Sequence, residues 1–296
     1  MKFTLLPAVG ALLLCACATA PAPSAAPSVV SAVVAVSAAP AVPKGEVVEG
    51  PTVHTAASLR ELVQNAQVSL PAAANGGTAF NGKFKDIPAS ATARVPVLVF
   101  LHGSSGLGLK AIGEWQQWLA AQGIASVAPD SFALPGRLTY KSPIDKAVYE
   151  RVHALRLSEI APTVAALAAA PWADGSRLVL AGTSEGATSV ARHSGSGFRG
   201  RILYAWSCED NYFSAGHATR LPAEQPVLNV ISLTDPFFSP ANPWLGNAQA
   251  RGHCGAALAQ HKNATVVLMA GAPHTLLTLP AARHATAGFL QDLFKP

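Results

Sequence analysis

Short, fully apolar runs alternate with longer amphipathic stretches through the second two-thirds of the chain. Val95–Leu101 is continuously apolar, which is typical of a strand buried on both faces of a sheet. Ala125–Ala128 has the same character and ends at Pro129-Asp130. Further buried strands are predicted at Leu178–Ala181, Ile202–Trp206, Val227–Ser232 and Thr265–Met269.

The stretches between these runs have helical periodicity. In Lys110–Gln122 the residues Ile112, Trp115, Trp118 and Leu119 recur on one face, which predicts an amphipathic helix. Other helices are predicted at Thr55–Gln67, Asp145–Ala170, Ala187–Arg192 and Ala281–Phe294, and a hairpin or edge strands at Gly76–Phe84. Strands that alternate with helices indicate an α/β fold with a mostly parallel sheet covered on both faces.

The start of the chain has the pattern of a bacterial export signal. Lys2 gives a positive start, and the apolar run from Leu5 to Leu14 is too short to span a bilayer as a stable helix. The tetrapeptide that ends at Cys17 resembles the lipobox of bacterial lipoproteins, in which a small residue precedes the lipid-modified Cys. We therefore expect residues 1–16 to be a signal peptide and Cys17 to carry lipid; an ordinary cleaved signal is the alternative.

Residues 17–45 are almost wholly Ala, Pro, Ser and Val, a composition that buries little surface and predicts a semi-extended tether. We expect residues 46–296 to form a single folded domain, with its core from about residue 95 to residue 294. The lipoprotein resemblance, with Ala rather than Asp after the lipidated Cys, implies an anchor on the periplasmic side of the outer membrane. In that oxidising compartment Cys208 and Cys254 are candidates for a disulfide, and two buried thiols are the alternative.

The net charge of +5 comes from basic residues scattered along the chain. Because they form neither a tail nor a stripe, we predict a solvated surface and no nucleic-acid partner. The sequence has no H-E-x-x-H or C-x-x-C motif, so we expect no metal and no other cofactor.

Gly182-Thr183-Ser184-Glu185-Gly186 follows the apolar run Leu178–Ala181 and precedes a predicted helix. This is the G-x-S-x-G pattern of a nucleophile elbow, in which glycines let strand and helix approach around a strained Ser. The surroundings support this interpretation over a plain Gly-rich turn. Asp235 follows one later strand, and His274 comes after the last one.

The order Ser, Asp, His, together with the loop His102-Gly103-Ser104 after the first strong strand, resembles the α/β-hydrolase fold. The resemblance covers residues 70–294 and is closest to the dienelactone-hydrolase-like branch. Dienelactone hydrolase itself carries Cys in its elbow, whereas this chain carries Ser184. The resemblance therefore implies acyl-transfer chemistry and leaves the substrate open.

These residues have distinct expected roles. His274 would act as the general base that activates Ser184, and Asp235 would hold the imidazole in the required tautomer. Glu209 and Asp210, just after the preceding strand, are the alternatives for the acid. The backbone N–H groups of Glu185 and Ser104 would form the oxyanion hole, and His102 would pack and hydrogen-bond the oxyanion loop.

The sequence thus predicts a lipid-anchored, exported serine hydrolase acting on a small ester or thioester. Two alternatives remain. Gly106–Ala111 fits G-x-G-x-x-A, with Asp130 at the end of the next strand, which is the outline of a dinucleotide-binding oxidoreductase. The second alternative is a non-catalytic lipoprotein with a hydrolase fold, because a fold alone never establishes activity.

Overall fold

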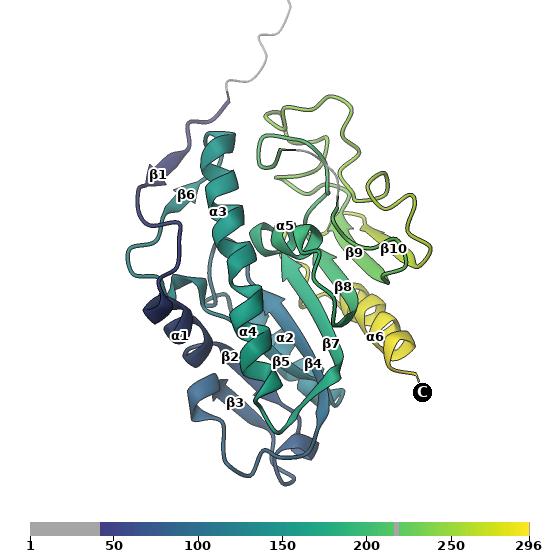
Figure 1. Cartoon of the computed structure of the whole chain (residues 1–296). Coiled ribbons are helices and arrows are strands. Elements are labelled where there is room, and N and C mark those ends of the chain that lie inside the picture. Colours follow the sequence, from purple (N-terminus) through teal and green to yellow (C-terminus); the bar gives the residue numbers. More distant parts are fainter. Residues whose placement is uncertain (1–41, 216–218, 296) are drawn as a thin grey trace, which may run out of the picture. The chain divides into compact units, whose positions relative to one another are not determined.

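An eight-stranded sheet organises residues 42–215 and 219–295, the part of the chain that the computed structural model describes (Figure 1). The strand order is β10-β9-β8-β7-β4-β5-β2-β3, and the strands from β5 to β10 are parallel. β2 pairs antiparallel with β5 and with β3. The strands are β2 (Gln67–Leu70), β3 (Phe80–Lys83), β4 (Val95–Leu101), β5 (Ala125–Ala128), β7 (Ala173–Thr183), β8 (Phe198–Tyr204), β9 (Val227–Ser232) and β10 (Ala264–Met269).

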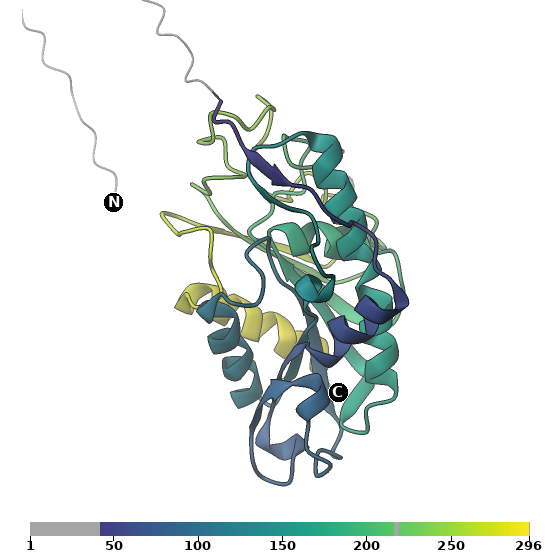
Figure 2. The ribbon, with the colours of Figure 1, turned by 90° about the vertical axis from the view of Figure 1, so that its left-hand side faces the viewer.

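Helices cover both faces of this sheet (Figure 2). They are α1 (Ala56–Gln64), α2 (Lys110–Ala121), α3 (Lys146–Ser158), α4 (Ile160–Ala168), α5 (Glu185–Arg192) and α6 (Pro280–Phe294). Helices α2 and α6 pack on one face, and α3, α4 and α5 lie on the other. This is the predicted α/β class, with the antiparallel pair β2–β3 at one edge.

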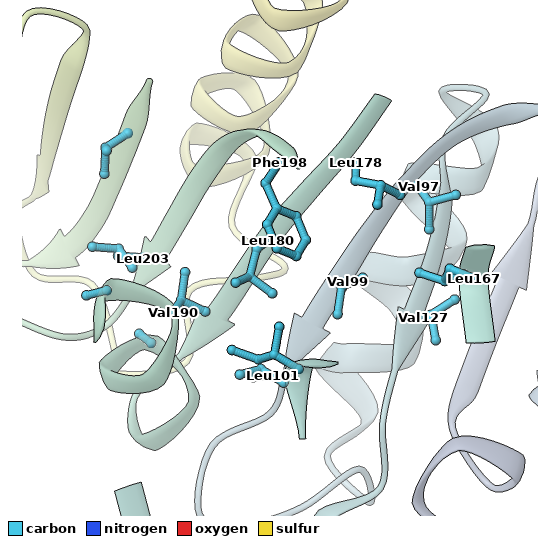
Figure 3. Close-up of a cluster of buried hydrophobic side chains, with 14 of the residues drawn as sticks. Val97, Val99, Leu101, Val127, Leu167, Leu178, Leu180, Val190, Phe198 and Leu203 are labelled. Atoms are coloured by element: carbon cyan, nitrogen blue, oxygen red, sulfur yellow. The ribbon is translucent and has the colours of Figure 1, made fainter. Parts of the chain in front are cut away.

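Strand β4 is apolar throughout because both of its faces are buried. Val97, Val99 and Leu101 point into the cluster that includes residues of α4 and α5, shown in Figure 3. Leu98 and Phe100, the alternate residues, point into the cluster against α2 and α6. All five are 0% exposed, because successive side chains of a strand point to opposite faces and both faces are covered.

The prediction of one long helix over Asp145–Ala170 is wrong in one respect, because the structure has two helices in this range. α3 ends at Ser158 and α4 begins at Ile160, with Glu159 between them. Pro162 lies in the first turn of α4, where its ring removes a backbone N–H and conflicts with the carbonyl of the preceding turn. The proline therefore separates the two segments.

Other differences from the predicted elements concern short segments. The helix predicted to reach Gln67 ends at Gln64, and Gln67 begins strand β2. Strands β1 (Glu46–Val48) and β6 (Thr139–Lys141) form a separate two-stranded sheet that the hydrophobic pattern does not indicate. Within the described residues, no helix combines the length and apolar character needed to cross a bilayer.

Cys208 and Cys254 form a disulfide, with their Cα atoms 4.7 Å apart. It joins the segment after β8 to the segment before β10, and both cysteines are fully buried. The predicted pairing is therefore present in the structure.

Replacing both cysteines by Ala is expected to lower the free energy of unfolding by roughly 2–4 kcal/mol, because the unfolded chain regains the entropy of an open loop. The sequence separation that sets this entropy is 46 residues. Urea denaturation of the double variant measures the effect. The wild-type chain, unfolded and refolded in reductant, should show the same loss. Equal stability of the oxidised and variant proteins would contradict the expectation.

Candidate active site

The turn after β7 has the backbone of a nucleophile elbow. Ser184 has φ 52° and ψ −117°, a conformation that L-residues rarely adopt, and it immediately precedes α5. Its N–H donates to the carbonyl of Tyr204 on β8 at 2.9 Å, and its carbonyl accepts from Ala187 in the first turn of α5. The strained residue is thus fixed from both sides at the carboxyl end of the parallel sheet.

The two glycines of the motif are required by close backbone contacts. A Cβ atom at Gly182 would lie 2.6 Å from the carbonyl carbon of Gly186, so the strand and the helix touch there. A Cβ atom at Gly186 would lie 2.1 Å from the carbonyl oxygen of Leu101. The elbow therefore packs directly against the end of β4, where the predicted oxyanion loop begins.

Asp235 and His274 meet at the same end of the sheet. Asp235 follows β9, His274 follows β10, and Asp235 Oδ2 accepts from His274 Nδ1 at 2.7 Å. The other carboxylate oxygen, Oδ1, accepts from the backbone N–H groups of Phe237 and Phe238 at 2.9 and 3.1 Å. These bonds fix the Asp235 carboxylate, which is fully buried. They also direct the Nε2 atom of His274 away from Asp235.

The alternative acids are engaged elsewhere. Glu209 accepts from the backbone N–H groups of Arg251 and Gly252 at 2.6 and 2.9 Å and so holds the segment next to the disulfide. Asp210 pairs with Lys146 at 2.8 Å, and the two side chains are 55% and 41% exposed. Of the three candidate acids, the structure brings only Asp235 into contact with His274.

The loop after β4 lies against the elbow. A Cβ atom at Gly103 would be 3.5 Å from the Cβ atom of Ser184, and Ser104 lines the same pocket as Ser184. Glu185 is the first residue of α5, at the positive end of the helix dipole. The predicted oxyanion residues Ser104 and Glu185 therefore flank Ser184 from two elements.

His102 packs against this loop and forms a hydrogen bond with it, as predicted. The Ser131 N–H donates to His102 Nε2 at 3.2 Å, so the proton of the neutral ring is on Nδ1. Nδ1 then donates to the Gly103 carbonyl at 2.6 Å. Burial, followed by the charge of Arg156, lowers the pKa of His102 to about 3, so the ring stays neutral. In a trans peptide the C=O and N–H point in opposite directions, so this bond turns the Ser104 N–H away from the ring.

Two substitutions at His102 test its two hydrogen bonds one at a time. Asn places a donor near the position of Nδ1 and retains the bond to Gly103, whereas Gln places an acceptor near Nε2 and retains only the bond from Ser131. For catalysis that uses the Ser104 N–H, we expect His102→Gln to lower kcat by about 10- to 100-fold, a part of the cost of a lost oxyanion donor. His102→Asn is expected to stay within about threefold of wild type, since the orienting bond remains. Steady-state kinetics measures both, and a larger loss for Asn than for Gln would contradict the orienting role.

A group of buried charged residues surrounds the side chain of Glu185, and we term it the buried charge network: Arg137, Arg156, Glu159 and Glu185, with Tyr140. Glu185 accepts from Arg137 at 3.0 Å, Arg156 at 2.8 Å and the Tyr140 hydroxyl at 2.7 Å. Arg156 also donates to Glu159 at 2.8 Å. All four charged side chains are at most 1% exposed, and two positive charges balance two negative ones.

Two pKa values reflect this network. Burial alone would raise the pKa of Glu185, but the charges of Arg137 and Arg156 and the Tyr140 hydrogen bond offset it and hold the pKa at about 2. Burial, followed by the charge and hydrogen bond of Glu185, raises the pKa of Tyr140 well above its ordinary value. Glu185 is therefore charged and Tyr140 protonated at neutral pH.

A pocket of about 120 Å³ opens above Ser184 and is lined by His274 and by the predicted oxyanion loop. Aromatic residues Tyr140, Tyr212, Phe213, Phe237 and Phe238 line it, with Leu109, Ile112 and Leu277. The consecutive pairs Tyr212-Phe213 and Phe237-Phe238 both line the pocket. Tyr140 was missed, because nothing in its local sequence distinguishes it from a surface residue.

Arg137, Arg156 and Glu159 were also missed. One signal could have indicated Arg156, which falls on the apolar stripe of α3 with Tyr149 and Val152. A charged residue on a buried stripe requires a buried partner. No such pattern marks Arg137, which lies in a loop.

Residues of the dinucleotide-binding pattern have other roles. Asp130 accepts from the backbone N–H of Phe132 and caps a short 3₁₀ turn, Ser131–Ala133. Gly106 lines the pocket above Ser184. Among the residues that the structure describes, no cluster of three or more His, Cys, Asp or Glu has the arrangement of a metal site.

No protein-family model matches the chain, and no curated protein matches it by sequence. Solved structures do match. The dienelactone hydrolase-like promiscuous phosphotriesterase P91 from metagenomic libraries is 18% identical with a TM-score of 0.50, over 77% of this chain and 95% of that one. Est1E from Butyrivibrio proteoclasticus is 16% identical with a TM-score of 0.48, over 78% and 94%. Esterase PE8 is 18% identical with a TM-score of 0.47, over 70% and 97%.

The strand order, the elbow after β7 and the match to P91 define the α/β-hydrolase fold. The resemblance to dienelactone-hydrolase-like proteins is confirmed at the level of the fold. At 18% identity the match to P91 says nothing of this chain's substrate.

Proposed function

We propose that the protein is a serine hydrolase that cleaves a carboxylic ester or thioester through an acyl-enzyme. The observation that carries the proposal is the Asp235–His274 hydrogen bond in the pocket that contains Ser184 at its strained elbow. The names of P91, a dienelactone hydrolase-like phosphotriesterase, and of esterase PE8 are consistent with hydrolysis.

In the proposed reaction, Ser184 Oγ attacks the substrate carbonyl carbon while His274 Nε2 takes the hydroxyl proton. The Glu185 and Ser104 N–H groups stabilise the oxyanion. As the tetrahedral intermediate collapses, the bond to the leaving group breaks and His274 returns the proton to that group. Water then attacks the acyl-enzyme, His274 takes its proton and passes it to Ser184, and the carboxylic acid leaves. Asp235 stabilises the imidazolium in both halves.

A fluorophosphonate probe tests the proposal. The purified domain should be labelled at Ser184, as located by mass spectrometry, and Ser184→Ala should not be labelled. Ser194→Ala, a change at an exposed serine, is the matched control and should label like wild type. An unlabelled but well-folded wild-type protein would favour the non-catalytic alternative.

We also propose that the protein is exported and anchored to the outer membrane through lipid on Cys17. Cys17 lies outside the described residues, so the proposal rests on the signal pattern and on the Cys208–Cys254 disulfide, which suits an oxidising compartment. Palmitate labelling in a bacterial host should be lost in Cys17→Ala and kept in Cys15→Ala. Equal labelling of both variants would contradict the assignment.

A further inference from the structure

The pocket beside Ser184 has an aromatic wall, which we define as Tyr212, Phe213, Phe237 and Phe238. Phe213 and Phe238 pack edge to face with 5.3 Å between their ring centroids, and Tyr212 stacks on Phe238 at 6.3 Å. Phe237 meets the His274 imidazole edge to face at 4.7 Å. These four rings come from two segments, after β8 and after β9, that converge over the catalytic end of the sheet.

Both segments of the wall are held by hydrogen bonds and by the disulfide. The Asn211 side chain accepts from the N–H groups of Phe213 and Ser214, while Asp235 accepts from those of Phe237 and Phe238. The Cys208–Cys254 disulfide fixes the first segment close to its start. A wall whose backbone is fastened in this way offers a preformed surface, so a ligand gains contact without a large ordering cost.

The pocket carries no fixed charge. Among the described residues that line it, none is Lys, Arg, Asp or Glu. The nearby carboxylates of Asp235 and Glu185 are already paired, with His274 and with the two arginines of the buried charge network. A carboxylate on the substrate would lose its hydration here without a cation to replace it, which is unfavourable. The pocket therefore favours an uncharged group.

Its volume sets the size of that group. Pockets for drug-sized ligands measure roughly 300–1,000 Å³, whereas an apolar cavity of roughly 150 Å³ binds benzene. At about 120 Å³, the space above Ser184 holds one ring or a short chain. Rings also gain from edge-to-face contact with the wall beyond the apolar area that they bury.

We propose that the substrate is an ester of a small, uncharged aromatic carboxylic acid, whose ring occupies the pocket against the aromatic wall. The inference rests on the proposed function, because it assigns the acyl group of the same acyl-enzyme. The acyl group is the part assigned to the pocket, because it stays bonded to Ser184 while the leaving group departs.

The test compares p-nitrophenyl benzoate with p-nitrophenyl cyclohexanecarboxylate, which share a leaving group and a ring size. Each kcat/KM is divided by the rate constant for hydroxide-catalysed hydrolysis of the same ester, which removes the difference in intrinsic reactivity. We expect the normalised kcat/KM for benzoate to be about 3- to 10-fold higher than that for cyclohexanecarboxylate, which is the factor that one aromatic contact contributes. We expect p-nitrophenyl octanoate to fall below both, because its chain exceeds the pocket.

Variants then assign the preference to the wall. Phe238→Leu should bring the benzoate-to-cyclohexanecarboxylate ratio close to one. Phe198→Leu, at a buried ring of β8 outside the pocket, should keep the wild-type ratio. An unchanged ratio in Phe238→Leu, or a normalised preference of wild type for cyclohexanecarboxylate or octanoate, would overturn the inference.

Hydrolysis of p-nitrophenyl acetate separates failure of this inference from failure of the proposed function. Acetate turnover that requires Ser184, together with no preference for benzoate, overturns the aromatic acyl group alone. Absence of turnover with every ester, together with absence of fluorophosphonate labelling, overturns the proposed function and this inference with it.

Discussion

Asp235→Asn is expected to lower kcat by about 10⁴-fold, the largest effect of any conservative change at the site. Asn keeps the shape of Asp and can still accept from the N–H groups of Phe237 and Phe238 through its carbonyl oxygen. Its amide nitrogen, however, would donate to His274 Nδ1 and place the imidazole proton on Nε2. An imidazole in that tautomer cannot accept the proton of Ser184.

Steady-state hydrolysis of p-nitrophenyl acetate measures this loss, and thermal unfolding checks that the fold is retained. Asp210→Asn is the matched control. It removes an exposed carboxylate in the segment after β8, where the sequence left an alternative acid, and should change kcat less than twofold, on the order expected for a surface substitution. If Asp210→Asn were the damaging variant and Asp235→Asn the mild one, the assignment of the acid would be wrong.

Glu185→Gln is expected to lower the free energy of unfolding by about 3–5 kcal/mol, because it leaves Arg137 and Arg156 buried with one carboxylate between them. Chemical denaturation at pH 7 measures the loss. Glu224→Gln is the control, since Glu224 pairs with Lys262 at the surface with both side chains 71% exposed. That change should alter stability by less than about 1 kcal/mol.

The same residue gives the protein a pH dependence. The pKa of Glu185 is held at about 2, below its ordinary value of 4.5. Its charged form therefore stabilises the fold above pH 4.5, and this contribution is lost as the pH falls from 4.5 towards 2. Glu185→Gln should show a shallower decline than wild type over this range. Parallel curves for the two proteins would show that another group governs acid unfolding.

Much of the fold could be predicted from the sequence, because the central strands are buried on both faces. Val95–Leu101 and Val227–Ser232 have the predicted bounds, since a continuous apolar run has one stable place in such a sheet. Strand β2 was missed because it is short and follows α1 after a brief turn, so that its apolar residues could equally continue the helical pattern. The break between α3 and α4 was missed although Pro162 is visible in the sequence.

The candidate site was predicted unevenly, for a physical reason. Ser184, Asp235 and His274 each follow a strand, so their convergence follows from the parallel sheet. The pairing of Glu185 with Arg137 and Arg156 depends on how a loop and a helix pack against the elbow, and charged residues in a sequence ordinarily indicate exposure. The size and lack of charge of the pocket depend on side-chain packing between distant segments.

The buried charge network and the aromatic wall lie on different segments of the chain. The network fastens the elbow through α3 and the loop before β6, whereas the wall projects from the segments after β8 and β9. Under the proposed function, substitutions confined to the side chains of the wall can therefore change which ester is accepted while the parts that position Ser184 stay intact. Such a division makes the scaffold a suitable starting point for directed evolution of new substrate preferences.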